Sequence, residues 1–275
     1  MRCIITLFLI CNFGSILYSQ NIAQTLEMAM NDAQLGYVDA ALKKYQRILF
    51  FGDSETDILC FDQLGKIHYQ KGEFAKAIRY FDLVKINAKD VPQRANASFD
   101  KIACLIMRDE FLLAQSELFQ IPNKDTFLSR KHFYQGIIHL ENGESEYAKQ
   151  SFLNLLEPQS EIVISRIDSV FQELDKWNRR KPKTAKLLSM LVPGAGQLYA
   201  KDYKNAANSA MLNGLAIFLF VETAKSVSLL DALFSVIPFF YKYYEGGYRA
   251  AEYSILEGQQ LEKAKLLTYV IKSLQ

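Results

Sequence analysis

Residues 64–84 read LGKIHYQKGEFAKAIRYFDLV and are the clearest indication of how the first half of the chain folds. Apolar residues recur three and four positions apart on both sides of Gly72, which is the spacing of an amphipathic helix. Glycine adopts a left-handed turn at low cost, so Gly72 marks a break between two helices. Ala77 lets the second helix approach the first closely, and Phe81 fills the space beside it. The stretch therefore predicts a helix-turn-helix unit.

Three other segments match the second half of this stretch: GYVDAALKKYQRIL, DEFLLAQSELFQI and GESEYAKQSFLNLL. All copies have an alanine in register, at intervals of 36, 37 and 34 residues: Ala41, Ala77, Ala114 and Ala148. A bulky side chain follows each alanine by four positions: Tyr45, Phe81, Leu118 and Phe152. A period sustained in this way is typical of stacked helical repeats, and a plain helical bundle with fortuitous spacing is the alternative.

With these alanines and the preceding glycines, residues 24–157 resemble the tetratricopeptide repeat family. Two features depart from the family pattern: Asp109 stands where glycine is usual, and most spacer prolines are missing. The resemblance implies a right-handed solenoid whose concave face, built from the first helix of each repeat, binds peptides or partner proteins. On that implication the candidate contact residues are Lys66, Tyr69, Gln70 and His139.

The N-terminus has the order of a secretory signal peptide. In MRCIITLFLICNFGSILYSQ, Arg2 precedes an apolar run, and small or polar residues follow at Ser15 and Ser19. We expect export and cleavage after Ser19, so that residues 1–19 form the signal peptide. An uncleaved membrane anchor is the alternative, because the run comes close to the length of a span.

The chain changes character after Pro158. Residues 162–177 predict an amphipathic helix, and KWNRRKPKTAK, residues 176–186, follows with six basic residues and no acid. This basic patch is either a solvated linker or a surface that lies against anionic lipid headgroups. Its position just before an apolar region favours the lipid. We therefore expect an amphipathic helix and a basic linker at 158–186.

Two apolar runs, residues 206–221 and 227–241, predict a helical hairpin within a domain at 187–255. Each run is slightly shorter than the roughly 20 residues of a standard membrane span, and flanking residues could extend both. Polar side chains interrupt the runs and would have to face one another or the protein interior in a membrane: Asn208, Asn213, Glu222 and Asp231. A soluble helix pair packed on the repeats is the alternative. We expect a separate C-terminal helix at 256–275.

The segment before the first run reads Pro193-Gly194-Ala195-Gly196-Gln197-Leu198-Tyr199. Residues 184–255 resemble a family of small bacterial membrane domains whose signature is proline, glycine, any residue, glycine, glutamine, any residue, tyrosine. In that family two hydrophobic helices and a Tyr/Gly-rich end follow, and its biochemical activity is not established. The resemblance implies that Pro193, Gly194, Gly196, Gln197 and Tyr199 open a membrane domain.

Two indications of orientation conflict. Export would place the repeats and both ends of the hairpin in the periplasm. The basic patch would then lie outside, against the tendency of positive charge to remain in the cytoplasm. We favour export, because the signal segment decides where a folded repeat domain goes.

Sequence offers little support for catalysis or for binding of nucleic acid. Residues 51–57, FGDSETD, resemble the nucleophile block of GDSL-type esterases, with Ser54 as the nucleophile. That site also needs an Asp-x-x-His pair, and none of His68, His132 or His139 has Asp three positions earlier. We expect no metal or cofactor. The net charge of +2 gives no overall basic field, and the basic patch lacks the interleaved aromatic residues of a nucleic-acid site.

We therefore expect an all-α protein: a helix-turn-helix repeat solenoid followed by a helical hairpin embedded in a membrane. As its function, we predict an exported, membrane-anchored scaffold of the bacterial cell envelope, with periplasmic repeats that bind other proteins or peptides. A membrane domain that acts or oligomerises by itself, with the repeats as its regulator, is the alternative, and an esterase is third.

Cys60 and Cys104 are either two buried apolar residues or a disulfide pair.

Overall fold

The computed structural model describes residues 21–51, 54–156 and 161–274, and every regular element in these ranges is an α-helix. The predicted all-α class is confirmed. The chain divides into two compact units, Met1–Asn142 and Gly143–Gln275. The predicted signal peptide, and with it Cys3 and Cys11, lies outside the described residues.

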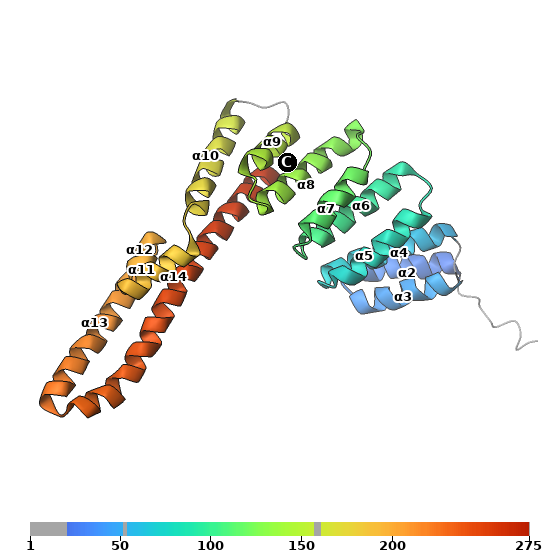
Figure 1. The fold of residues 1–275 in the computed structure, drawn as a ribbon. Coiled ribbons are helices and arrows are strands. Elements are labelled where there is room, and N and C mark those ends of the chain that lie inside the picture. The colour runs from blue at the N-terminus through green and yellow to red at the C-terminus, as the bar shows by residue number, and fades with distance from the viewer. Residues whose placement is uncertain (1–20, 52–53, 157–160, 275) are drawn as a thin grey trace, which may run out of the picture. The chain divides into compact units, whose positions relative to one another are not determined.

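The first unit is a succession of helices that pack on their neighbours in the sequence. Blue to green ribbons in Figure 1 show them as α2 (Ile22–Gln34), α3 (Val38–Phe51), α4 (Ser54–Gln70), α5 (Phe74–Asn87), α6 (Val91–Ile106), α7 (Phe111–Gln120) and α8 (Asp125–Glu141). Short turns join α2 to α3, α4 to α5 and α6 to α7, so these helices form hairpins, in agreement with a helical repeat.

Close packing within these hairpins depends on the alanines that the repeat places in register. Ala41, Ala77 and Ala114 have no exposed surface, and the bulky residue one turn later is buried beside each of them. In the middle hairpin, a Cβ atom on Gly65 would lie 2.6 Å from the Phe81 ring. A glycine on α4 is therefore needed where Phe81 of α5 crosses it.

The turn between the two helices of a repeat requires a left-handed residue. Gly36 and Gly72 have φ angles of +81° and +73° at this position. Asp109, which replaces the glycine between α6 and α7, adopts the same conformation with φ +59°. A left-handed L-residue costs about 1–2 kcal/mol, although Asp tolerates this region better than most residues.

Buried cysteines and a buried carboxylate lie in the same unit. Cys60 and Cys104 are free thiols, and burial raises the pKa of each to about 12. Burial would also raise the pKa of Glu117, but hydrogen bonds from Lys85, Ser98 and Lys101 hold it below its ordinary value. These bonds tie α7 to α5 and α6, because Glu117 accepts from Ser98 at 2.7 Å and pairs with Lys101 at 3.0 Å.

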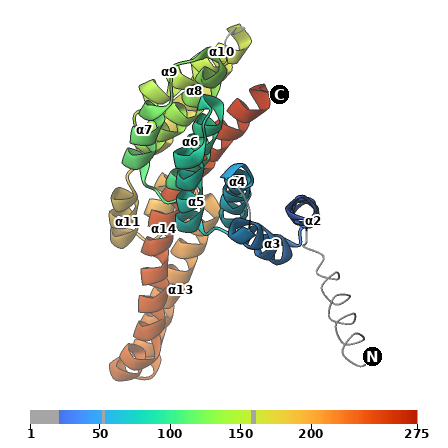
Figure 2. The same cartoon turned by 90° about the vertical axis from the view of Figure 1, so that its right-hand side faces the viewer.

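The second unit contains a long hairpin. Its helices are α9 (Ser145–Leu155), α10 (Glu161–Asn178), α11 (Pro182–Leu191), α12 (Ala195–Tyr199), α13 (Tyr203–Ser226) and α14 (Leu229–Ser273). Figures 1 and 2 show α13 and the first half of α14 side by side as far as the tip, where two residues connect them. The hairpin predicted from the two apolar runs is therefore present as a pair of antiparallel helices.

Two expectations about boundaries need correction. The separate helix at 256–275 does not exist, because α14 continues without a break from Leu229 to Ser273. The basic linker is short, because Pro182 starts α11 within it. The division between the two compact units falls after Asn142, within residues 24–157, to which we assigned the repeats. The Ala148 copy thus falls on α9 in the second unit, where Ala148 and Phe152 are buried.

We predict that Asp109→Gly increases the free energy of unfolding by about 0.5–1 kcal/mol, because it removes the cost of a left-handed L-residue. The measurement is chemical denaturation followed by circular dichroism. Gly72→Asp is the matched reciprocal change and should lower the stability by a similar amount. A loss of stability with Asp109→Gly would mean that the Asp109 side chain itself holds the turn.

Candidate binding groove and membrane hairpin

The first unit has a groove between the first helices of successive hairpins. Residues of α4, α6 and α8, together with Val84 of α5, line a cavity of about 520 Å³. Most of its lining side chains are polar or charged: Asp62, Gln63, Lys66, Gln93, Asn96, Asp100 and Arg130. The groove therefore presents hydrogen-bonding groups from three helices to one space.

Ion pairs partly neutralise the groove. Lys66 Nζ lies 2.6 Å from an Asp62 oxygen on the same helix. Arg130 of α8 crosses to α6, where it donates to Asn96 Oδ1 at 3.0 Å and lies 3.5 Å from Asp100. Burial raises the pKa of Asp100, and Arg130 and Lys66 offset part of that rise. The groove thus holds two carboxylates and two cations, a surface suited to a polar peptide with charges of both signs.

The predicted contact residues divide between two places. Lys66 lines the groove, and Tyr69 and Gln70 follow one helical turn later on the same face of α4. The Tyr69 side chain is 38% exposed and its ring packs edge-on against Phe74. His139 instead lines a separate cavity of about 290 Å³ between α7 and α8. The structure therefore brings Lys66 close to Tyr69 and Gln70 and places His139 at another site.

Sequence analysis missed several of the groove residues, although their spacing marks them. Asp62, Asn96 and Arg130 follow one another at intervals of 34 residues, and Arg130 bonds Asn96 directly. The same interval separates Lys66, Asp100 and Tyr134. The repeat of small apolar residues, on which the sequence prediction rests, belongs to the core. The polar residues of the first helices have a period of their own.

In the second unit, the predicted membrane motif forms a buried junction. Gln197 is 1% exposed and bridges two helices with its side-chain amide. Its Oε1 accepts from Ser189 Oγ of α11 at 2.7 Å, and its Nε2 donates to the Gly247 carbonyl of α14 at 2.6 Å. The Gly196 amide donates to the same Ser189 oxygen at 2.9 Å. Ser189 therefore acts as donor and acceptor at once and completes a network that joins α11, α12 and α14.

The motif glycines allow the backbone to come this close. A Cβ atom on Gly196 would lie 1.9 Å from the Ala185 carbonyl oxygen. Gly194 has φ +96°, and its Cβ would lie 2.7 Å from the Ala206 carbonyl oxygen. Pro193 is half-buried, and the Tyr199 hydroxyl accepts from the Lys181 amide at 3.3 Å. The structure thus brings the predicted motif residues together, and it adds Ser189 and Gly247 as their partners.

The hairpin beyond this junction has an apolar surface. Among the described helices, α13 is the one that is both long enough and apolar enough to cross a membrane. The first half of α14 exposes large apolar side chains alongside it: Leu229, Leu230, Leu233, Phe234, Ile237 and Phe239. An exposed apolar surface of this kind marks a site of contact with protein or membrane.

Polar residues of the hairpin have three different positions. Asn213 is buried and donates to the Ser209 carbonyl at 2.7 Å, whereas Asn208 is exposed on α13. Glu222 and Asp231 are exposed near the turn at the tip of the hairpin. Lys242 is exposed on α14, 11 residues beyond Asp231. Apart from Lys242, the charged side chains thus lie near the two ends of the apolar surface.

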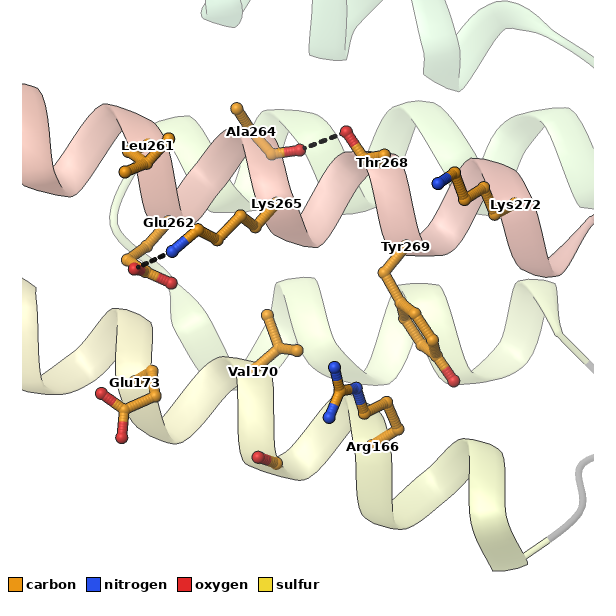
Figure 3. A pocket seen from close by; sticks show the side chains of 11 residues that line it. Arg166, Val170, Glu173, Leu261, Glu262, Ala264, Lys265, Thr268, Tyr269 and Lys272 are labelled. Carbon is orange, nitrogen blue, oxygen red and sulfur yellow. Dashed lines mark hydrogen bonds and ion pairs between the residues drawn. The ribbon is translucent and has the colours of Figure 1, made fainter.

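A second groove lies between α10 and the C-terminal part of α14. It has a volume of about 590 Å³, and Figure 3 shows side chains of both helices around it, with Tyr269 extending from α14 beside Arg166 of α10. Glu262 and Lys265 form an ion pair of 2.8 Å on one wall. Sequence analysis did not anticipate this groove, because we expected a helix boundary at 256, within α14.

The described residues contain no group of three or more His, Cys, Asp or Glu side chains that could hold a metal ion. His68 is buried, stacks on Tyr80 and lies 2.7 Å from a Glu73 oxygen. In the fragment that resembles an esterase nucleophile block, α4 begins at Ser54, while Gly52 and Asp53 lie outside the described residues. No protein family, no curated protein and no solved structure matches this chain.

We predict that Gly196→Ala destabilises the second unit by about 3 kcal/mol, because the added Cβ overlaps the Ala185 carbonyl oxygen. Thermal unfolding in detergent, followed by the fluorescence of Trp177, measures the junction, since Trp177 packs on the same apolar cluster as Tyr199. Gly214→Ala is the matched control, because no atom lies within 4 Å of its added Cβ. Equal stability of the two variants would contradict the packing described for Gly196.

Proposed function

We propose that the protein is a membrane-anchored scaffold that binds other proteins or peptides through the groove of its first unit. The observation that carries this proposal is the polar stripe of Asp62, Asn96 and Arg130, which repeats at the period of the helices and lines one groove. Residues that pack the core explain the repeat itself. Packing of the core does not require polar residues at the groove surface to recur with the same period. We therefore assign this polar stripe to recognition.

The apolar hairpin is the anchor in this proposal. The 24 residues of α13 extend about 36 Å, which exceeds the roughly 30 Å of a bilayer core. Charged residues near the tip, Glu222 and Asp231, would reach the far headgroups when the hairpin crosses. Lys242 is the exception, and a lysine in the membrane costs up to about 3 kcal/mol. The long apolar surface around it outweighs that cost.

Export completes the proposal. Residues 1–19 would direct the chain to the bacterial cell envelope, where the repeats face the periplasm. The basic residues before the hairpin favour the opposite orientation. Addition of protease to intact and to permeabilised cells distinguishes the two: cleavage of the repeats only after the outer barrier is opened supports export, and cleavage only after the inner membrane is opened contradicts it.

A second candidate function belongs to the junction around Gln197. Burial of a glutamine whose side chain bonds two different helices is more than a connection between helices requires, and it favours a membrane domain that acts or oligomerises by itself. In that case, loss of cellular function would follow Gln197→Ala but not changes in the groove. Loss with groove variants alone would favour the scaffold.

We predict that a photoreactive amino acid at Gln93 in the groove crosslinks a defined partner in cells and that Arg130→Ala reduces this product at least fivefold. Arg130 holds Asn96 and stacks on Phe99, so its loss removes both charge and shape from the groove. The matched control places the photoreactive residue at Gln120, on α7. A product that forms equally at both positions, or that is insensitive to Arg130→Ala, would contradict binding in the groove.

We predict that Phe234→Lys increases the carbonate-extractable fraction of the protein, because it adds a second lysine to the apolar surface that already contains Lys242. Phe234 is 81% exposed on the hairpin, and a lysine there costs up to about 3 kcal/mol of insertion free energy. Leu112→Lys is the control, because Leu112 is 80% exposed on α7. Carbonate extraction of the unaltered protein would show that the hairpin is not in the membrane.

A further inference from the structure

We propose that six basic residues at the base of the hairpin form a collar that binds the headgroups of anionic phospholipids. Three lie on the connection from α10 to α11, one in the first turn of α11, one on the turn from α12 to α13 and one in the first turn of α13: Arg179, Arg180, Lys181, Lys183, Lys201 and Lys204. This inference rests on the proposed membrane anchoring and adds the lipid class that the anchor selects.

The fold brings the two parts of the collar together. The Lys181 amide donates to the Tyr199 hydroxyl at 3.3 Å, which places the first connection beside the end of α12. Trp177 and Tyr199 pack on one apolar cluster that includes Ala200, the residue before Lys201. Lys201 and Arg180 both lower the pKa of Glu173, so their charges act on the same region. From the sequence alone, Lys201 and Lys204 could not be assigned to the basic patch.

Within the described residues, the collar lacks the acidic partners that neutralise its neighbours. Lys176 and Lys186 are paired with Glu173 and Glu252, whereas none of the six collar residues forms an ion pair there. Asp202 lies in the same turn, and the charge of Lys204 helps to lower its pKa, but its oxygens accept from Asn205 and Ser254 and form no ion pair with the collar. Arg180 stacks on Trp177, with the guanidinium carbon 4.4 Å from the ring centroid, and is half-buried, whereas the other five collar residues are exposed. The collar therefore carries an excess of unpaired positive charge.

The length of α13 places this charge at the level of the headgroups. Lys204 and Lys225 are 21 residues apart on the helix, which corresponds to about 31 Å and matches the thickness of a bilayer core. When Lys225 reaches one surface of the bilayer, Lys204 and the collar lie at the other. The exposed Tyr203 ring lies at the same level, and tyrosine is typical of that interface.

These two features point to a lipid surface as the occupant of the collar. A basic side chain close to the bilayer strengthens binding to anionic lipid by about fivefold, and several act together. The apolar hairpin holds the collar against the headgroups, so the phosphates meet it at high local concentration. Both ends of the hairpin leave the membrane on one side, and the collar therefore faces the leaflet nearest the rest of the chain in either orientation.

The test is synthesis of the full chain in a cell-free system with vesicles, followed by flotation. One set of vesicles is phosphatidylcholine and the other contains a third of phosphatidylglycerol. We expect at least tenfold tighter association with the anionic vesicles, and 0.5 M salt should remove this preference but not the flotation. The triple variant Lys181→Gln, Lys183→Gln, Lys201→Gln removes half of the collar and should lower this preference at least fivefold, without changing association with phosphatidylcholine.

The matched control is Arg166→Gln, Lys265→Gln, Lys272→Gln, which removes the same charge from the groove of α10 and α14. It should keep the tenfold preference. If both variants lose the preference for anionic vesicles equally, net charge and not the collar attracts the lipid. Equal flotation of the unaltered protein with both kinds of vesicle would also overturn the proposal. Failure to float with either vesicle would instead refute the membrane anchoring on which the proposal rests.

Discussion

Close approach between helices is the constraint on which both units depend. In the first unit, an alanine in each hairpin removes the side chain that would separate the two helices, and a bulky residue one turn later fills the space between neighbours. In the second unit, Gly196 lets the backbone of α12 approach the carbonyl of Ala185. Larger side chains at these points would separate the helices and with them the groove or the hairpin that they position.

The two units use this constraint for different purposes. Close packing in the first unit aligns the first helices, so that polar residues one repeat apart face the same groove and Arg130 can bond Asn96. In the second unit, close packing excludes water from Gln197, and the amide must then find its partners on Ser189 and Gly247. The periodic apolar core of the first unit thus positions a row of polar residues along the groove. The junction of the second unit instead allows one specific set of hydrogen bonds.

Much of the fold could be predicted from the sequence, because small and bulky residues recur at fixed intervals. Ala41, Ala77 and Ala114 are buried as their register predicts, and the hairpin follows the apolar runs. The C-terminal boundary was misplaced, because α14 continues through residue 256, and Gly258 within it leaves room for the Trp177 ring. The partners of Gln197 were out of reach, since Gly247 is 50 residues away and only the packed fold brings it near.

The uninterrupted α14 gives the second unit a mechanical property. Its 45 residues correspond to about 68 Å of helix, which begins at the apolar tip, includes Pro238, passes the Gln197 junction at Gly247 and ends beside the groove around Tyr269. Helices in bilayers tilt by about 20° on average. Rotation of that size about the junction would displace Ser273, about 39 Å further on, sideways by roughly 13 Å. In the proposed membrane anchor, a change in the tilt of the hairpin would therefore move the C-terminal end of α14 by this distance.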